Sequence, residues 1–265
     1  IFAGPGCAAA LAALERVKQK CDDSDYWSEI HKIFLAEGAH GPAYRTLCTA
    51  LGDHLNYTIK RLTTIAKERN ELNCLNWRLR VRITYSPQQL VCVDESACSN
   101  ATLHRRYGSS RRGKVAKTNR FYFHKGVRYS VLGPFVLDEG FLDLSVVVGG
   151  YDCDMFLNAL HQVVLPHMNA FPGPRSVLLM DNCIIHRQRA VLEAVHAIGA
   201  IVLFLEPYDP GSMPVEIAFR SMKSWLRRLG DSFGDAVSMP ARLRMASQSV
   251  GREAARNAFH TAGYL

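Results

Sequence analysis

The chain has 265 residues, of which 48% are apolar and 21% are charged, and its formal net charge is +8. This composition is that of an ordinary globular protein and excludes disordered and fibrous proteins, while the length allows one good core and a small appended module. No apolar run approaches the length of a membrane span, so we expect no membrane partner. The eight Cys residues include no C-x-x-C pair, which disfavours a zinc site.

The N-terminal region predicts a series of short helices. Residues 7–20 are Ala-rich and amphipathic, and apolar side chains of residues 26–37 share one helical face. Residues 38–41 break this second helix, and Pro42 opens a third one. Two short helices across a tight Gly-containing turn predict a helix-turn-helix, with residues 43–51 as the recognition helix. A small helical bundle that packs on the main domain is the alternative interpretation.

Two basic segments follow this region. Residues 57–73 predict a long connector helix that carries several Lys and Arg side chains. In residues 77–85, Arg alternates with apolar residues, and this two-residue period predicts a half-exposed or edge strand. Its arginine face could track a DNA backbone, although solvated protection of a sheet edge is the more ordinary explanation.

Strands and helices of a larger domain begin at residue 89. The apolar run 89–93 predicts a buried strand. Residues 128–137 and 141–148 alternate between apolar and polar side chains and predict a hairpin, and residues 151–168 predict a helix. The mixture of strands and helices indicates an α/β domain.

Two carboxylates are placed by the elements that come next. Residues 176–180 predict a buried strand with Asp181 at its carboxyl end, and residues 201–205 predict another strand. Three prolines then require a loop, because proline continues neither a central strand nor a helix. The last of them, Pro214, suits the first position of a helix and puts Glu216 in its first turn. We expect Asp181 and Glu216 to meet at one end of the sheet.

A third carboxylate comes from the strand at residues 89–93, which ends in Asp94 and Glu95. Neighbouring carboxylates repel, and their burial is costly unless a cation or a proton joins them. Three carboxylates with no Cys or His at metal-ligand spacing predict a hard oxygen site for Mg²⁺ or Mn²⁺. For each acid alone, a solvated strand end or a helix N-cap is the alternative.

Three motifs surround these acids. They read VDES at residues 93–96, MDNCIIH at residues 180–186, and LEPYDPGSMPVE at residues 205–216, followed by AFRSMKSWLRR. Together they resemble the three signatures of the DDE transposases of the mariner superfamily, whose Asp, Asp and Glu fall on Asp94, Asp181 and Glu216. The spacing of the last two, 216 − 181 = 35, matches the subgroup whose third acid is Glu.

The third motif departs from the usual family loop, which reads close to LPPYSPDLNPIE. Glu206, Asp209, Gly211, Ser212 and Met213 stand where Pro, Ser, Asp, Leu and Asn are usual. Met213 replaces the Asn that lies beside the third acid. This departure concerns activity rather than fold.

The resemblance implies a ribonuclease-H-like mixed-sheet catalytic domain behind a small all-α helix-turn-helix region. It also implies cut-and-paste cleavage and strand transfer by phosphoryl transfer with two Mg²⁺ or Mn²⁺ ions about 4 Å apart, with Asp94 bridging both ions. We expect Glu95, Asn182 and His186 beside these ligands, with His186 capping the following helix. The expected domains are a helix-turn-helix DNA-binding region with its connector (1–75), a linker or edge strand (76–88), the catalytic domain (89–230) and a C-terminal helical tail (231–265).

The expected polyanion partner is DNA. Nine basic residues and no acid lie from His104 to Arg128, which is typical of a polyanion contact, although a solvated basic hairpin is the alternative. The resemblance implies double-stranded DNA, as terminal inverted repeats and as target, together with a homodimer and a nuclear location. A typical member carries two DNA-binding units, and this chain has room for one. The candidate DNA contacts are Tyr44, Arg45, Thr49, Arg105, Arg106, Arg111, Arg112, Lys114 and Lys117.

Two other functions fit parts of the sequence. A transposase-derived DNA-binding protein with a decayed site is favoured by Met213 and the unusual loop, and disfavoured by the intact acids. A ribonuclease-H-type nuclease that acts on an RNA–DNA hybrid needs the same acids. It leaves the helical N-terminal region and the family-like loop unexplained.

Overall fold

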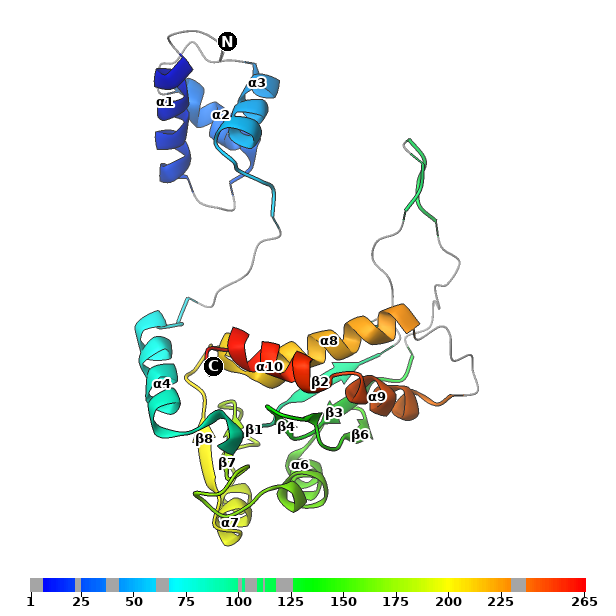
Figure 1. The fold of residues 1–265 in the computed structure, drawn as a ribbon. Coiled ribbons are helices and arrows are strands. Elements are labelled where there is room, and N and C mark those ends of the chain that lie inside the picture. The colour runs from blue at the N-terminus through cyan, green and yellow to red at the C-terminus, as the bar shows by residue number, and fades with distance from the viewer. Residues whose placement is uncertain are drawn as a thin grey trace. The chain divides into compact units, whose positions relative to one another are not determined.

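The computed structural model describes residues 7–21, 25–36, 43–60, 67–99, 102, 109–111, 113–117, 126–229 and 237–265. The chain divides into two compact units, residues 1–66 and residues 67–265 (Figure 1). The boundary lies ahead of the predicted one at residue 75, so the segment that follows residue 66 belongs to the second unit. No helix in these described ranges has the length and apolar character needed to cross a membrane.

The first unit is a small helical bundle. Its core contains one or two buried apolar side chains from each helical element, including Leu14, Ile30, Phe34 and Leu47. This packing confirms that the N-terminal region is helical. Its described elements are α1 (Cys7–Lys20), α2 (Trp27–Ala36), α3 (Tyr44–Thr49) and the turn η1 (Ala50–His54) that continues α3.

The second unit contains two β-sheets. The larger has the strand order β5-β4-β1-β7-β8, and the smaller has the order β2-β3-β6. In the larger sheet β1, β7 and β8 run parallel, β4 is antiparallel to β1, and β5 is antiparallel to β4, which confirms the mixed sheet. The strands are β1 (Leu90–Cys92), β2 (Glu95–Cys98), β3 (Tyr129–Leu132), β4 (Phe135–Val136), β5 (Gly140–Phe141), β6 (Ser145–Val148), β7 (Val177–Met180) and β8 (Ile201–Phe204).

Helices cover both faces of the larger sheet. Alternate residues of β1 and β7 point to opposite faces, as the period of a strand requires. Cys92 and Leu179 pack with residues of α8 and α10, whereas Val91 and Leu178 pack with residues of α6 and α7 (Figure 1). The helices are α4 (Glu71–Thr84), α6 (Cys153–Ala159), α7 (Arg189–Ala197), α8 (Pro214–Leu229), α9 (Met239–Gln248) and α10 (Arg252–Thr261), with the short turns η2 (Pro87–Gln89), η3 (Leu160–Val164), η4 (Leu165–His167) and η5 (Pro210–Ser212).

The predicted hairpin between residues 128 and 148 is divided between the two sheets. β3 pairs with β6 in the smaller sheet, and β4 pairs with β5 in the larger one. Gly133 and Pro134 separate β3 from β4, and proline has no N–H to continue a ladder. The turn glycine Gly140 has a φ of 87°, and an added Cβ would lie 2.0 Å from the Val250 carbonyl oxygen.

Two predictions between residues 57 and 85 were wrong. Within the segment expected to be one connector helix, residues 57–60 and 69–70 are extended or irregular, and α4 begins only after the N-cap Asn70. The expected edge strand is the second half of α4. Burial of Trp77 and Val81, four residues apart, against the core overrides the two-residue alternation of arginines.

The C-terminal residues form part of the core. Within residues 237–265, α9 and α10 both pack against α8. The side chains of Leu243, Phe259 and Tyr264 are buried in the same cluster as β1 and β7. These helices therefore close one face of the sheet.

Trp77→Ala should destabilise the protein by about 3–5 kcal/mol, because it removes a side chain from the core. Trp77 is only 8% exposed and packs edge-on against Tyr264, with ring centroids 6.5 Å apart. In the monomeric chain, Leu79→Ala should change stability by less than about 0.5 kcal/mol, because Leu79 is 47% exposed. Denaturant unfolding followed by circular dichroism measures both. Equal losses would contradict the helix, because a strand would put both residues on one face.

Candidate active site

The three predicted acids line one cavity. Asp94 follows β1, Asp181 follows β7, and Glu216 lies in the first turn of α8. Because β1 and β7 are parallel neighbours, with Cys92 opposite Leu179, their carboxyl ends meet at the same edge of the sheet. The cavity has a volume of about 380 Å³, and the loop from Leu205 to Met213 forms much of its wall.

Asp94 is the most strongly perturbed of these acids. Burial, followed by the nearby charges of Glu216 and Asp181, raises the pKa of Asp94 to about 8. The Glu95 N–H donates to Asp94 Oδ1 at 2.7 Å, and this hydrogen bond lowers the pKa of Asp94 in part. Asp94 thus shares a water-poor site with two like charges, an arrangement that a proton or a cation stabilises.

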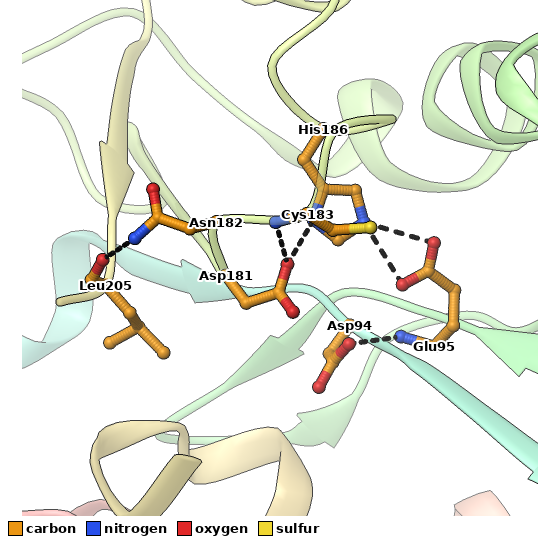
Figure 2. Close-up of polar contacts among 7 residues, drawn as sticks. All are labelled: Asp94, Glu95, Asp181, Asn182, Cys183, His186 and Leu205. Carbon is orange, nitrogen blue, oxygen red and sulfur yellow. Dashed lines mark hydrogen bonds and ion pairs between the residues drawn. The ribbon is translucent and has the colours of Figure 1, made fainter. Parts of the chain in front are cut away.

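His186 joins two carboxylates beside this cavity (Figure 2). Its buried imidazole has Nδ1 2.6 Å from Asp181 Oδ1 and Nε2 3.1 Å from both Glu95 carboxylate oxygens. Burial lowers the pKa of His186, but the hydrogen bonds and charges of Asp181 and Glu95 outweigh burial and raise it to about 10. The hydrogen bond from His186 in turn lowers the pKa of Asp181. His186 therefore links Asp181 to Glu95 and favours the ionised form of Asp181.

The expected helix-capping role of His186 was wrong. The N-cap of α7 is Gln188, and no side chain bonds at that cap. The backbone around His186 is instead ordered by Asp181, whose Oδ1 accepts from the Cys183 N–H at 2.9 Å. The Asn182 side-chain amide donates to the Leu205 carbonyl and ties the end of β7 to the start of the loop after β8 (Figure 2).

Two of the residues that depart from the usual loop, Asp209 and Ser212, belong to a buried polar network. Asp209 is buried and pairs with Arg69 at 3.0 Å, and it accepts from the Ser212 hydroxyl. The Tyr264 hydroxyl donates to the Ser212 carbonyl at 2.8 Å. Sequence reasoning missed Arg69 and Tyr264, and the only signal was that an acid in this proline-rich loop would need a cation. The network fixes the loop that precedes Glu216.

A basic stripe on α8 was also missed. Arg220, Lys223 and Arg227 follow Glu216 at spacings of four, three and four residues, so they lie on one helical face with it. Arg220 is exposed, while Lys223 and Arg227 lie near enough to Cys98 of β2 to lower its pKa against the effect of burial. The stripe leads away from the acids along the helix.

The donor set fits a hard divalent cation. Three carboxylates share one cavity, and the raised pKa of Asp94 reports the repulsion that such a cation would relieve. As the described side chains stand, no group of three His, Cys, Asp or Glu residues is gathered closely enough to hold an ion. The Asp181 carboxylate is directed toward His186, which accounts for part of this spread.

The candidate DNA contacts fall into three groups. Tyr44, Arg45 and Thr49 are exposed on α3 in the first unit, and its recognition role stays a prediction. Arg111, Lys114 and Lys117 are exposed in the second unit. Arg105, Arg106 and Arg112 lie outside the described residues.

Comparison with known families decides the membership of the chain. The family described as DDE superfamily endonuclease matches residues 89–239, which is more than half of the sequence. The chain belongs to the DDE superfamily endonucleases. All three acids lie within the matched residues.

Solved structures of Mos1 transposase share the fold. A Mos1 strand transfer complex is 15% identical with a TM-score of 0.60, and a Mos1 transposase paired-end complex with left transposon end is 14% identical with a TM-score of 0.59. A third, a Mos1 mariner paired end complex with Mn, is 15% identical with a TM-score of 0.56. Each match covers 96% of this chain and 78% of the other. The ribonuclease-H-like fold is thereby confirmed. A comparison with curated proteins gives no match.

Mn²⁺ should raise the midpoint of thermal unfolding of the wild-type chain, and Asp94→Asn should abolish the shift. Because a metal binds the ionised carboxylate, a pKa of about 8 means that the apparent affinity rises up to about tenfold per pH unit below 8 and levels off above it. Thermal scans with and without Mn²⁺ between pH 6 and 9 measure this. Glu193→Gln on the exposed face of α7 is the control and should keep the full shift.

Arg69→Met should destabilise the protein by about 2–3 kcal/mol, because it leaves Asp209 buried without a cation. We expect a smaller loss of stability than for a fully buried ion pair, because the Arg69 side chain is 24% exposed and solvent screens its charge. Adding Asp209→Asn should recover part of it. Arg175→Met, which removes the exposed pair with Glu139, should cost less than about 1 kcal/mol. Similar losses for Arg69 and Arg175 in denaturant unfolding would contradict the buried network.

Proposed function

We propose that this DDE superfamily endonuclease is a DNA transposase of the mariner superfamily that performs cut-and-paste cleavage and strand transfer at element ends. The observation that carries the proposal is that Asp94, Asp181 and Glu216, from two adjacent parallel strands and a helix, line one cavity. The likeness in fold to Mos1 complexes with transposon ends supports it.

Asp94, Asp181 and Glu216 would together hold the proposed pair of Mg²⁺ or Mn²⁺ ions. Such ions activate water as a nucleophile and stabilise the leaving 3′ oxygen of a phosphodiester. The chain itself keeps Asp181 ionised through His186 and orients that imidazole through Glu95. Asn182 holds the end of β7 against the loop that leads to Glu216.

The substrate is proposed to be double-stranded DNA, both as terminal inverted repeats and as target. The basic stripe of α8 starts beside Glu216, where Arg220, Lys223 and Arg227 can follow a phosphate backbone into the cavity. The exposed Tyr44, Arg45 and Thr49 of α3 are proposed to contact the repeats as part of a helix-turn-helix. We further propose a homodimer and a nuclear location for this activity.

A decayed, binding-only protein is the second candidate, and Met213 favours it. The Met213 side chain is 1% exposed and lines the cavity, where the family usually supplies an amide. Its backbone carbonyl accepts from the Glu216 N–H at 3.1 Å and so still supports the third acid. A protein of this kind would bind DNA but would not cut it.

Nicking of supercoiled plasmid in Mn²⁺ at low salt should occur with the wild-type chain and vanish in Asp181→Asn. Loss of one ligand to the ions should lower the rate by about a hundredfold or more, while the fold stays intact. Agarose gels measure nicking, and circular dichroism checks the fold.

Glu193→Gln is the matched control and should nick at the wild-type rate, because Glu193 is exposed on α7. Nicking that survives Asp181→Asn would refute the proposed site. A folded wild-type chain that binds DNA but does not nick it would support the decayed protein.

A further inference from the structure

Helix α4 presents two apolar faces instead of one. The inner face carries Cys74, Trp77 and Val81, which are buried in the core of the second unit. The opposite face carries four large apolar side chains, which we call the outer stripe. They are Leu72 (72% exposed), Leu75 (47%), Leu79 (47%) and Ile83 (84%).

The spacing of the outer stripe is that of a helix-pairing seam. Its members follow one another at three, four and four residues, so they form one continuous row along a helix of 14 residues. Scattered apolar side chains are common on protein surfaces, but a contiguous row usually marks an interaction site. An apolar partner suits this row, because the phosphate backbone of DNA offers it nothing to bury.

The charges beside the outer stripe indicate which partner fits. Glu71 near the start of α4 and Arg82 near its end are both exposed and lie on the same flank of the stripe. The flank separation, 82 − 71 = 11, equals the separation of the outermost stripe residues, 83 − 72 = 11. On the other flank Asn73 and Asn76 lie toward the start of the helix and Arg80 toward its end. The surface is therefore self-complementary when it is reversed.

We propose that the outer stripe of α4 pairs with the same stripe of a second copy of this chain, in an antiparallel and two-fold symmetric arrangement. One register satisfies every position: Leu72 meets Ile83 of the partner subunit, Leu75 meets the partner's Leu79, and Glu71 meets the partner's Arg82. Arg80 then faces the partner's Asn73. A parallel pairing would bring the flank that carries Glu71 against the opposite flank of the second copy, where the partner's Asn73 and the partner's Asn76 offer it no opposite charge, and is disfavoured.

This surface is inferred from α4 alone and does not depend on the nuclease activity. It identifies the contact through which the proposed homodimer forms. Docking of the first unit of the same chain onto the stripe is the competing occupant. Charge-reversal variants of two chains, measured alone and mixed, distinguish the two cases. A contact within one chain would not become stronger when two variants are mixed.

The test uses the full chain in sedimentation equilibrium at low salt. Glu71→Arg alone sets two arginines against each other twice in the dimer, and Arg82→Glu alone does the same with glutamates. Each variant should therefore dimerise about tenfold more weakly than the wild type. An equimolar mixture of the two restores both opposite-charge contacts, so its affinity should return to within about threefold of the wild-type value.

A substitution in the apolar row provides the second measurement. Ile83→Glu should give a monomer with an unchanged circular dichroism spectrum, because Ile83 is 84% exposed and supports no core. Val148→Glu on β6, where Val148 is 68% exposed, is the control and should leave the dimer intact. A wild-type chain that stays monomeric, a dimer unaffected by Ile83→Glu, or a mixture no stronger than its components would overturn the proposal.

Discussion

The pairing of β1 with β7 as parallel neighbours is the constraint on which the site depends. It brings the carboxyl ends of two fully buried strands to one edge of the sheet, where the chain emerges as Asp94 and Asp181. Apolar side chains above and below both strands hold this register, because a slip would drive core residues into the wrong layer. The favourable packing of the second unit therefore offsets the repulsion between the two carboxylates.

Two polar networks convert this edge into a defined site. On one side the buried His186 ring lies between Asp181, which follows β7, and Glu95, which starts β2, so one ring connects acids from the two sheets. On the other side Arg69, Asp209, Ser212 and Tyr264 fix the loop that precedes Glu216. Each network joins residues of distant elements, so the position of each acid is set by contacts beyond its own strand or helix.

Local sequence patterns correctly predicted the strand ends and the helix start that carry the three acids. Apolar runs followed by acids identified the strand ends at Asp94 and Asp181, and a proline before Glu216 identified the helix start. The helix at Trp77 was missed because its exposed arginines alternate, while its burial is decided by the distant C-terminal helices. The contacts of Arg69 with Asp209 and of Tyr264 with Ser212 join residues 140 and 52 positions apart, which no local pattern reveals.

The hydroxyl of Tyr264 links the segment after α10 to the loop that precedes Glu216. It touches the carbonyl of Ser212, two residues ahead of the helix that carries Glu216. Shortening the sequence by its last two residues would remove this contact and open a hole beside Trp77. An affinity tag or a fluorescent fusion for this protein is therefore better attached before α1, where it lies outside the compact unit that holds the acids.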